Sequence, residues 1–127
     1  MLHEQVRTLA EGANFAALTT LMPDGQPQTH IMWVGCDEDH ILINTEVHRR
    51  KFKNVEADPR VTVAIWDVDN AYSFVEIRGR VVETVTGPAA LDSINALSRK
   101  YTGGDYKPEI QSERVILKIA PDRQVTR

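Results

Sequence analysis

The chain has 127 residues, a formal net charge of −3 and 42% apolar residues, which fits one domain with a continuous core and leaves no room for two. No apolar run approaches the roughly 20 residues that span a bilayer, and the acidic balance argues against nucleic acid as a partner, because a phosphate backbone requires a broad basic face. The N-terminus lacks the pattern of a signal peptide and Cys36 is the only cysteine, so we expect a cytoplasmic protein whose residues 1–127 form a single domain without a disulfide.

In the first half of the chain, hydrophobic spacing predicts two helices and three strands. The helices cover residues 2–12 and 49–57, and the strands cover residues 15–21, 27–34 and 40–45. Gly12 ends the first helix and Pro59 follows the second. Pro23-Asp24-Gly25 predicts a tight turn between the first two strands, and residues 35–39 predict another turn before the third.

In the second half, a long hairpin precedes a helix and a final strand. The hairpin strands cover residues 60–66 and 72–85, the helix runs from Pro88 to about Tyr101, and the last strand covers residues 113–120. The inward face of the helix is expected to hold Leu91, Ile94, Leu97 and Ser98. Gly79 predicts a bulge in the hairpin, and Pro121 is expected to stop the last strand. Six strands and three helices without regular βαβ alternation predict a mainly β (α+β) fold, an antiparallel barrel with peripheral helices.

The most informative segment is residues 44–54, Asn44-Thr45-Glu46-Val47-His48-Arg49-Arg50-Lys51-Phe52-Lys53-Asn54. It places four Lys or Arg residues within five positions of an acidic chain, directly after a strand. The N–H groups of a helix's first turn attract anions, and guanidinium groups hold phosphate oxygens in pairs. We therefore interpret the segment as a phosphate-binding element for a flavin-like cofactor. The alternative, a solvated basic helix that joins two strands, stays open.

Motifs for other kinds of chemistry are absent from the sequence. It contains no Gly-x-Gly-x-x-Gly or Walker-type loop, and its four histidines lack the spacing of metal ligands, so no metal site is expected. His30 suits either a hydrogen-bonded structural histidine or a catalytic one, and the sequence identifies no catalytic residue. If the protein is an enzyme, we expect a bound redox cofactor to supply the reactive group.

Several stretches, taken in order, resemble one family. They are residues 23–27, 44–45 with the basic helix, 58–61, 75–81, 100–103 and 114–121. Their order and spacing are similar to those of the pyridoxamine-phosphate-oxidase-like split β-barrel family, and within it to the coenzyme F420-dependent (deazaflavin) oxidoreductases. The resemblance implies an FMN-binding-like, six-stranded antiparallel split β-barrel with peripheral helices. It also implies a homodimer with two cofactor sites between the subunits.

The same resemblance implies which residues bind the cofactor. They are Thr29, His30, Ile31, Met32 and Trp33 along the ring, and Asn44, Thr45, Arg49, Arg50 and Lys51 around the phosphate, where Thr45 would donate a hydrogen bond. Asn54 is expected to brace either the basic helix or the ligand. Trp66 would line the ring pocket, although both tryptophans also fit a core role. Arg50 directly before Lys51 matches the FMN-binding branch and Arg49 matches the deazaflavin branch, so F420 and FMN both stay open. As a charge on an exposed helix, Lys51 is expected to affect thermal stability little.

The expected function is that of a reductase, in which reduced F420 passes a hydride from C5 of its ring to a small reducible substrate. Three alternatives stay open: an FMN-dependent oxidoreductase on the same fold, a non-catalytic flavin-binding protein, and an oligonucleotide-binding barrel, which the acidic balance disfavours. Oxidation of pyridoxamine phosphate is not expected, because Thr29 and Val34 stand where that oxidase has Arg and Lys.

Overall fold

The computed structural model describes all 127 residues and contains three helices and seven strands. In chain order they are α1 (Glu4–Glu11), β1 (Phe15–Leu21), β2 (Pro27–Met32), β3 (Gly35–Cys36), β4 (Ile41–Glu46), α2 (Arg50–Ala57), β5 (Arg60–Asp67), β6 (Asn70–Val85), α3 (Pro88–Thr102) and β7 (Arg114–Thr126). The strands form one antiparallel sheet in the order β2-β1-β5-β6-β7-β4-β3. The predicted mainly β, antiparallel fold with peripheral helices is confirmed.

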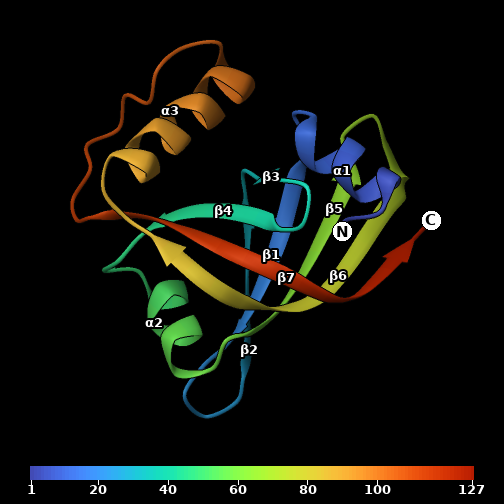
Figure 1. The fold of residues 1–127 in the computed structure, drawn as a ribbon, viewed down its shortest axis with the longest axis horizontal. Helices are drawn as coiled ribbons and strands as arrows, with labels where there is room; N and C mark the ends of the chain where they lie inside the picture. Colours follow the sequence, from blue (N-terminus) through green and yellow to red (C-terminus); the bar gives the residue numbers. More distant parts are fainter.

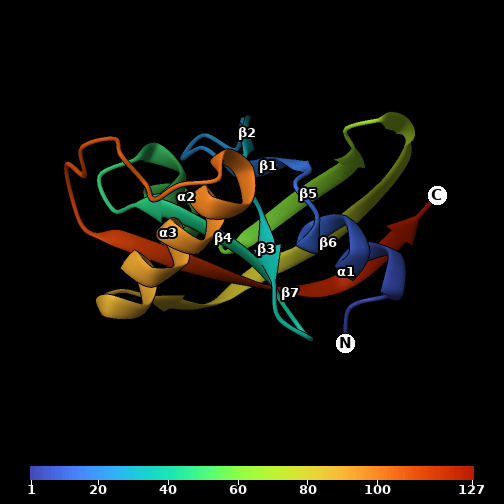
Figure 2. The same cartoon turned by 90° about the horizontal axis from the view of Figure 1, so that it is seen from above.

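The sheet curls into a split barrel because its two edge strands are neighbours in the chain. β2 and β3 lie at opposite ends of the strand order, yet only Trp33 and Val34 separate them. Three Cα–Cα steps reach at most about 11 Å, so the sheet has to bend until its edges meet, as Figures 1 and 2 show. The strand count is seven instead of the expected six, because Gly35 and Cys36, expected in a turn, pair with Leu42 and Ile41.

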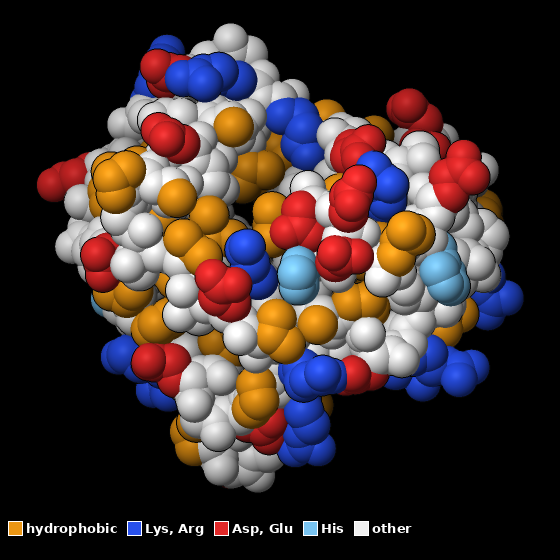
Figure 3. All heavy atoms as spheres, viewed as in Figure 1, with side chains coloured by type: hydrophobic (Ala, Val, Ile, Leu, Met, Phe, Trp, Pro, Cys, Tyr) orange, Lys and Arg blue, Asp and Glu red, His pale blue; other side chains and the backbone are white.

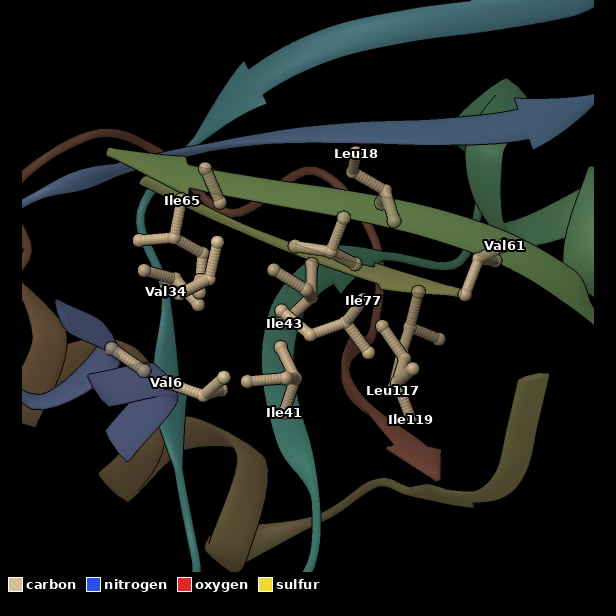
Figure 4. Close-up of a cluster of buried hydrophobic side chains, with 14 of the residues drawn as sticks. Val6, Leu18, Val34, Ile41, Ile43, Val61, Ile65, Ile77, Leu117 and Ile119 are labelled. Atoms are coloured by element: carbon tan, nitrogen blue, oxygen red, sulfur yellow. The ribbon is translucent and has the colours of Figure 1, made fainter. Parts of the chain in front are cut away.

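The core lies inside the curl, where alternate residues of each strand meet. Figure 4 shows Ile43 of β4, Ile65 of β5, Ile77 of β6 and Leu117 of β7 pointing toward one another, and all four are fully buried. Val6 of α1 closes one end of this cluster. Burial of each such side chain contributes about 1.5–3 kcal/mol to stability, so the sheet's inward face holds the barrel together.

The last strand is longer than its sequence predicts. β7 continues through Pro121 to Thr126, where Pro121 was expected to stop it. The pairing of β6 with β7 shifts register between Arg78 and Gly79, and Gly79 faces Pro121 at this bulge. A proline is tolerated where the regular ladder is interrupted. The bulge predicted at Gly79 is confirmed, and a Cβ atom there would collide with the carbonyl oxygen of Ala120.

Helix α3 covers one side of the sheet, and its buried face includes Ala90 in place of the expected Leu91. Ala90, Ile94 and Ser98, spaced four residues apart, are buried, whereas Leu91 is 45% exposed. The side-chain amide of Asn44 donates a hydrogen bond of 2.9 Å to the carbonyl of Ala90 and so ties α3 to β4. None of the three helices is both long and apolar enough to cross a membrane.

Candidate functional site

A cavity of about 680 Å³ opens among β2, α2, α3 and the segment that leads into β7. Eight of the twelve residues predicted to bind a cofactor line it: Thr29, His30, Ile31, Met32, Trp33, Asn44, Arg49 and Lys51. The remaining lining residues, which are absent from the predicted cofactor-binding set, are Phe15, Ile94, Leu97, Tyr106, Pro108 and Arg114. Cavities of this size suit a small ligand or cofactor.

One wall of the cavity is apolar and aromatic. The indole of Trp33 stacks on the ring of Tyr101, with centroids 5.1 Å apart and planes 4° apart. Tyr106 meets the same indole edge-on at 6.3 Å. Aromatic pairs in these geometries are favourable beyond the area that they bury. Trp33 therefore presents a flat surface to the cavity in one fixed orientation.

The backbone next to Trp33 is held by the end of α3. The ammonium group of Lys100 donates hydrogen bonds to the carbonyls of Val34, at 2.6 Å, and Ala10, at 3.0 Å. The N–H of Val34 donates to the hydroxyl of Tyr101 at 3.1 Å. Lys100 and Tyr101 thus fix the two-residue link that joins the edges of the barrel, and neither residue lines the cavity.

A group of three cations, which we call the cationic group, lines the cavity: Arg49 and Lys51 at the start of α2 and Arg114 at the start of β7. The helix begins without a side-chain cap and without an acidic residue in its first turn. Cationic side chains and uncapped N–H groups at one place favour an anion.

Lys51 is buried, with only 6% of its surface exposed, which corrects the expectation of an exposed helix charge. The phase of α2 explains this, because Lys51 shares the inward face with Asn54 and Val55. Its ammonium group forms no ion pair and no hydrogen bond within the chain. Burial first, and then the charges of Arg49 and Arg114, lower the pKa of Lys51. An unpaired, desolvated cation in a cavity wall is suited to pair with an anion.

Arg114 is 4% exposed and is held on three sides. Its Nε donates to the side-chain oxygen of Asn44 at 2.9 Å, its Nη1 contacts the carboxylate of Glu46 at 3.3 Å, and its guanidinium lies over the ring of Tyr106 at 5.2 Å. Burial lowers the pKa of Arg114, although an arginine stays charged. The sequence offers one signal for it, an arginine that opens an otherwise apolar strand.

Glu46 is the carboxylate behind the cationic group. It is 1% exposed and accepts hydrogen bonds from the N–H groups of Gln111, at 2.8 Å, and Ser112, at 2.7 Å. Its second oxygen contacts Arg114 at 3.3 Å and Arg49 at 3.4 Å. Burial alone would raise the pKa of Glu46, but the two N–H donors and the two guanidinium groups outweigh it and lower that pKa. Glu46 is therefore ionised at neutral pH.

Comparison with known families decides the family of this chain. Residues 2–125 match the family described as pyridoxamine 5'-phosphate oxidase. The chain belongs to the pyridoxamine 5'-phosphate oxidase family. Members of this family bind flavin-like cofactors and are commonly oxidoreductases, which agrees with a cavity that joins a flat aromatic wall to a cationic group.

Solved structures of similar proteins agree with the family and its split-barrel fold. A protein titled "F420 Reductase" is 30% identical with a TM-score of 0.83, over 97% of this chain and 98% of that one. A conserved hypothetical protein from Mycobacterium tuberculosis is 27% identical with a TM-score of 0.77, over 98% and 82%. General Stress Protein 26 from Bacillus anthracis, at 21% identity and a TM-score of 0.71 over 95% and 89%, is alike in fold. A search of curated protein sequences finds no match.

In this member of the pyridoxamine 5'-phosphate oxidase family, four predicted site residues lie outside the cavity: Thr45, Arg50, Asn54 and Trp66. Thr45 faces the core because strand residues alternate and its neighbour Asn44 faces the cavity; its buried hydroxyl has no hydrogen-bond partner. Asn54 donates to the hydroxyl of Thr20 at 3.0 Å and so braces α2 against β1. Arg50 is exposed to solvent, and Trp66 lies half-buried on β5.

Two further residues of this family member bear on catalysis. His30 is exposed on the cavity wall and its side chain forms no hydrogen bond within the chain, so the structural interpretation of His30 does not apply. Cys36 lies in a second cavity of about 390 Å³ between α1, β3 and α3. Burial and the charge of Glu11 raise the pKa of the Cys36 thiol, so it is not an activated nucleophile. No three His, Cys, Asp or Glu side chains lie close enough to hold a metal ion.

Charge on the face shown in Figure 3 is mixed. Acidic and basic side chains lie beside one another there, and apolar side chains gather in a hollow beside α3. The face shows no extended basic surface of the kind that a nucleic-acid backbone requires. The cationic group is therefore a local feature of one cavity in a chain with a formal net charge of −3.

Proposed function

We propose that this protein is a reductase that uses reduced coenzyme F420 to reduce a small substrate. One observation carries the proposal: a single cavity combines the flat wall of β2 and Trp33 with the cationic group Arg49, Lys51 and Arg114. That combination fits a ring joined to a phosphate. The similarity to a protein titled "F420 Reductase" over nearly the full length of both chains supports the choice of F420.

The residues that line the cavity fit both the phosphate and the ring of the cofactor. Lys51, buried and without a partner in the chain, would pair with the phosphate, and Arg49 would hold a second oxygen. Thr29 to Trp33 would lie along the ring, since β2 is an edge strand whose outer backbone groups have no strand partner. When bound, reduced F420 supplies a hydride from C5 of its ring. Phe15, Ile31 and Leu97 would exclude water from that end of the cavity.

The position of the two arginines supports F420 over FMN. Arg49, which matches the deazaflavin branch, lines the cavity, whereas Arg50, which matches the FMN branch, is exposed to solvent. FMN remains the second candidate because the family as a whole binds flavin-like cofactors. Transfer of the hydride to substrate distinguishes either enzyme from a protein that only binds the cofactor.

Titration of the purified protein with F420 and with FMN, followed by absorbance and fluorescence, tests the assignment. F420 carries several glutamates beyond its phosphate, and FMN ends at the phosphate. We therefore expect Arg49→Ala to weaken F420 binding about tenfold and FMN binding less, because with FMN only a phosphate contact is lost and with F420 a glutamate contact is lost as well. Lys53→Ala should act in the same direction, and added salt should weaken F420 binding more steeply, because exposed charge contacts are screened.

Arg60→Ala is the matched control for these variants. Arg60 is exposed, follows α2, and pairs with Asp58 away from the cavity, so its loss should leave both affinities unchanged. FMN that co-purifies stoichiometrically and is not displaced by F420 would refute the F420 assignment in favour of FMN. Cofactor-bound protein that reduces no compound in a broad substrate screen would favour the non-catalytic binding protein.

We also infer a homodimer with the cavity near its interface. Ile31, in the cavity wall on the edge strand β2, is 60% exposed, and an exposed apolar side chain beside a ligand site suits cover by a second copy. Light scattering at micromolar concentration is expected to give twice the mass of 14.3 kDa. A monomer that still binds cofactor would contradict the inference.

A further inference from the structure

Glu46 joins parts of the molecule that are distant in sequence. Through one buried carboxylate it contacts Arg49 directly before α2, Arg114 of β7 and the N–H groups of Gln111 and Ser112. Glu46 itself does not line the cavity, whereas both arginines do. A carboxylate in this place can act on a ligand only through the groups that it holds.

We propose that Arg114 binds the cofactor's anionic group together with Arg49 and Lys51, and that Glu46 is the positioning residue that orients both arginines. This inference rests on the proposed function in one respect, that the cavity takes a phosphate-bearing cofactor. It adds Arg114, 63 positions beyond Lys51, to the anion site, and it explains the buried carboxylate of Glu46 as the group that orients the two arginines.

The hydrogen bonds of Arg114 leave donors free for a ligand. A guanidinium group has five N–H donors; Asn44 accepts one from Nε and Glu46 accepts one from Nη1. Apart from an interaction with the side chain of Tyr106, the other N–H groups, including both on Nη2, form no further hydrogen bond in the chain, and the side chain lines the cavity. The guanidinium group of Arg114, held by Asn44 and Glu46 and covered by the ring of Tyr106, is pre-organised to hold two oxygens of one anion.

The charges also agree with an anion as the missing partner. Three cations face the cavity, and one carboxylate contacts two of them. Glu46 thus offsets part of the mutual repulsion of the cationic group and leaves an excess positive charge on the cavity side. A bound phosphate group would offset part of the remainder, since buried charges are stable when they are paired.

The same carboxylate connects the anion site to the cavity wall. The segment between α3 and β7 carries Tyr106 and Pro108, which line the cavity, and it is tied to Glu46 through Gln111 and Ser112. Loss of the charge on Glu46 would therefore loosen the arginines and this segment together.

A double-mutant cycle on F420 affinity tests the proposal. The variants are Glu46→Gln, which keeps the shape and removes the charge, Arg114→Lys, and the two combined, with Arg78→Lys as control because Arg78 is exposed and pairs with Glu76 away from the cavity. We expect each single variant to raise the Kd about tenfold or more. The double variant should lose clearly less than the product of the two, because Glu46 acts through Arg114. The control should leave the Kd unchanged.

Two outcomes of the cycle would overturn the proposal. A Glu46→Gln variant that melts at a lower temperature and binds F420 with unchanged Kd would show that Glu46 is structural only. An unchanged Kd in Arg114→Lys would remove Arg114 from the anion site. If Glu46→Gln does not fold, Glu46→Asp, which keeps the charge and shortens the reach, takes its place with the same expectations.

Inorganic phosphate separates this inference from the proposed function. In protein labelled with ¹⁵N-arginine, we expect phosphate to shift the Nε–H resonances of Arg49 and Arg114 in the wild type, and to shift them much less in Glu46→Gln. An Arg114 resonance that ignores phosphate overturns the inference even if F420 binds. Wild-type protein that binds neither F420 nor FMN refutes the proposed function, and a phosphate response of Arg114 would then still support the anion site.

Discussion

Replacement of Lys51 by methionine is expected to stabilise the cofactor-free protein and to weaken cofactor binding. Lys51 is buried without an ion pair, and methionine keeps most of its length while removing the desolvated charge. We expect a gain of about 1 kcal/mol in the free energy of unfolding at neutral pH, and a loss of roughly 1.5–3 kcal/mol in binding, because a charge-assisted contact to phosphate disappears. Thermal denaturation without cofactor and a Kd measurement check both parts.

The pH dependence gives this prediction a definite sign. The pKa of Lys51 is lowered in the folded chain from its ordinary value of 10.5, so the charged form is disfavoured by folding. The resulting loss of stability is full at neutral pH and fades as pH rises through the lowered pKa. The advantage of Lys51→Met over the wild type should therefore shrink at alkaline pH.

Lys53→Met is the matched control, since Lys53 lies on the same helix and is exposed. It should leave both stability and the Kd for FMN nearly unchanged. An unaltered Kd in Lys51→Met would mean that Lys51 does not bind the cofactor and that the basic segment only joins two strands. A loss of stability in that variant would mean that packing of the lysine stem outweighs the buried charge.

Replacement of Glu46 by alanine is expected to have the larger effect on folding. The change removes a buried carboxylate that serves two arginines and two backbone N–H groups, and the partners it leaves unpaired are costly to bury. We expect a loss of about 3–5 kcal/mol in the free energy of unfolding, measured by urea denaturation at neutral pH. A free energy of unfolding that stays near the wild-type value would contradict a stabilising role for the contacts of Glu46.

The stability of the protein at acid pH is expected to depend on the carboxylate of Glu46. The pKa of Glu46 is lowered in the folded chain from its ordinary value of 4.5, so its contribution is fully present above pH 4.5 and is lost as pH falls through the lowered pKa. Glu46→Gln should lack this part of the acid dependence. Asp58→Asn serves as control, because Asp58 pairs with Arg60 at the surface, where ion pairs contribute little. Parallel stability curves for wild type and Glu46→Gln would refute the prediction.

Local patterns in the sequence determine most of the fold. Alternation of apolar residues identifies the strands of the sheet, and helical spacing identifies all three helices, because these signals depend on the period of each element alone. The exceptions lie where contacts between elements decide. Gly35 and Cys36 carry no strand pattern and form β3 only because they pair with β4. Pro121 stays within β7 because it lies opposite Gly79, where a bulge interrupts the regular hydrogen bonding between β6 and β7.

The residues of the candidate site also fall into those that local sequence patterns indicate and those that only contacts between elements bring together. The basic segment at the start of α2 is contiguous and chemically conspicuous in the sequence, whereas β2 enters the predicted site only through the resemblance to the family. Only the tertiary structure decides which of these side chains face the cavity: Arg49 and Lys51 do, whereas Arg50, between them, faces solvent. It alone brings Arg114 and Glu46 to the cationic group, because strand pairing of β4 with β7 unites positions 68 residues apart, and no local pattern encodes such a pairing.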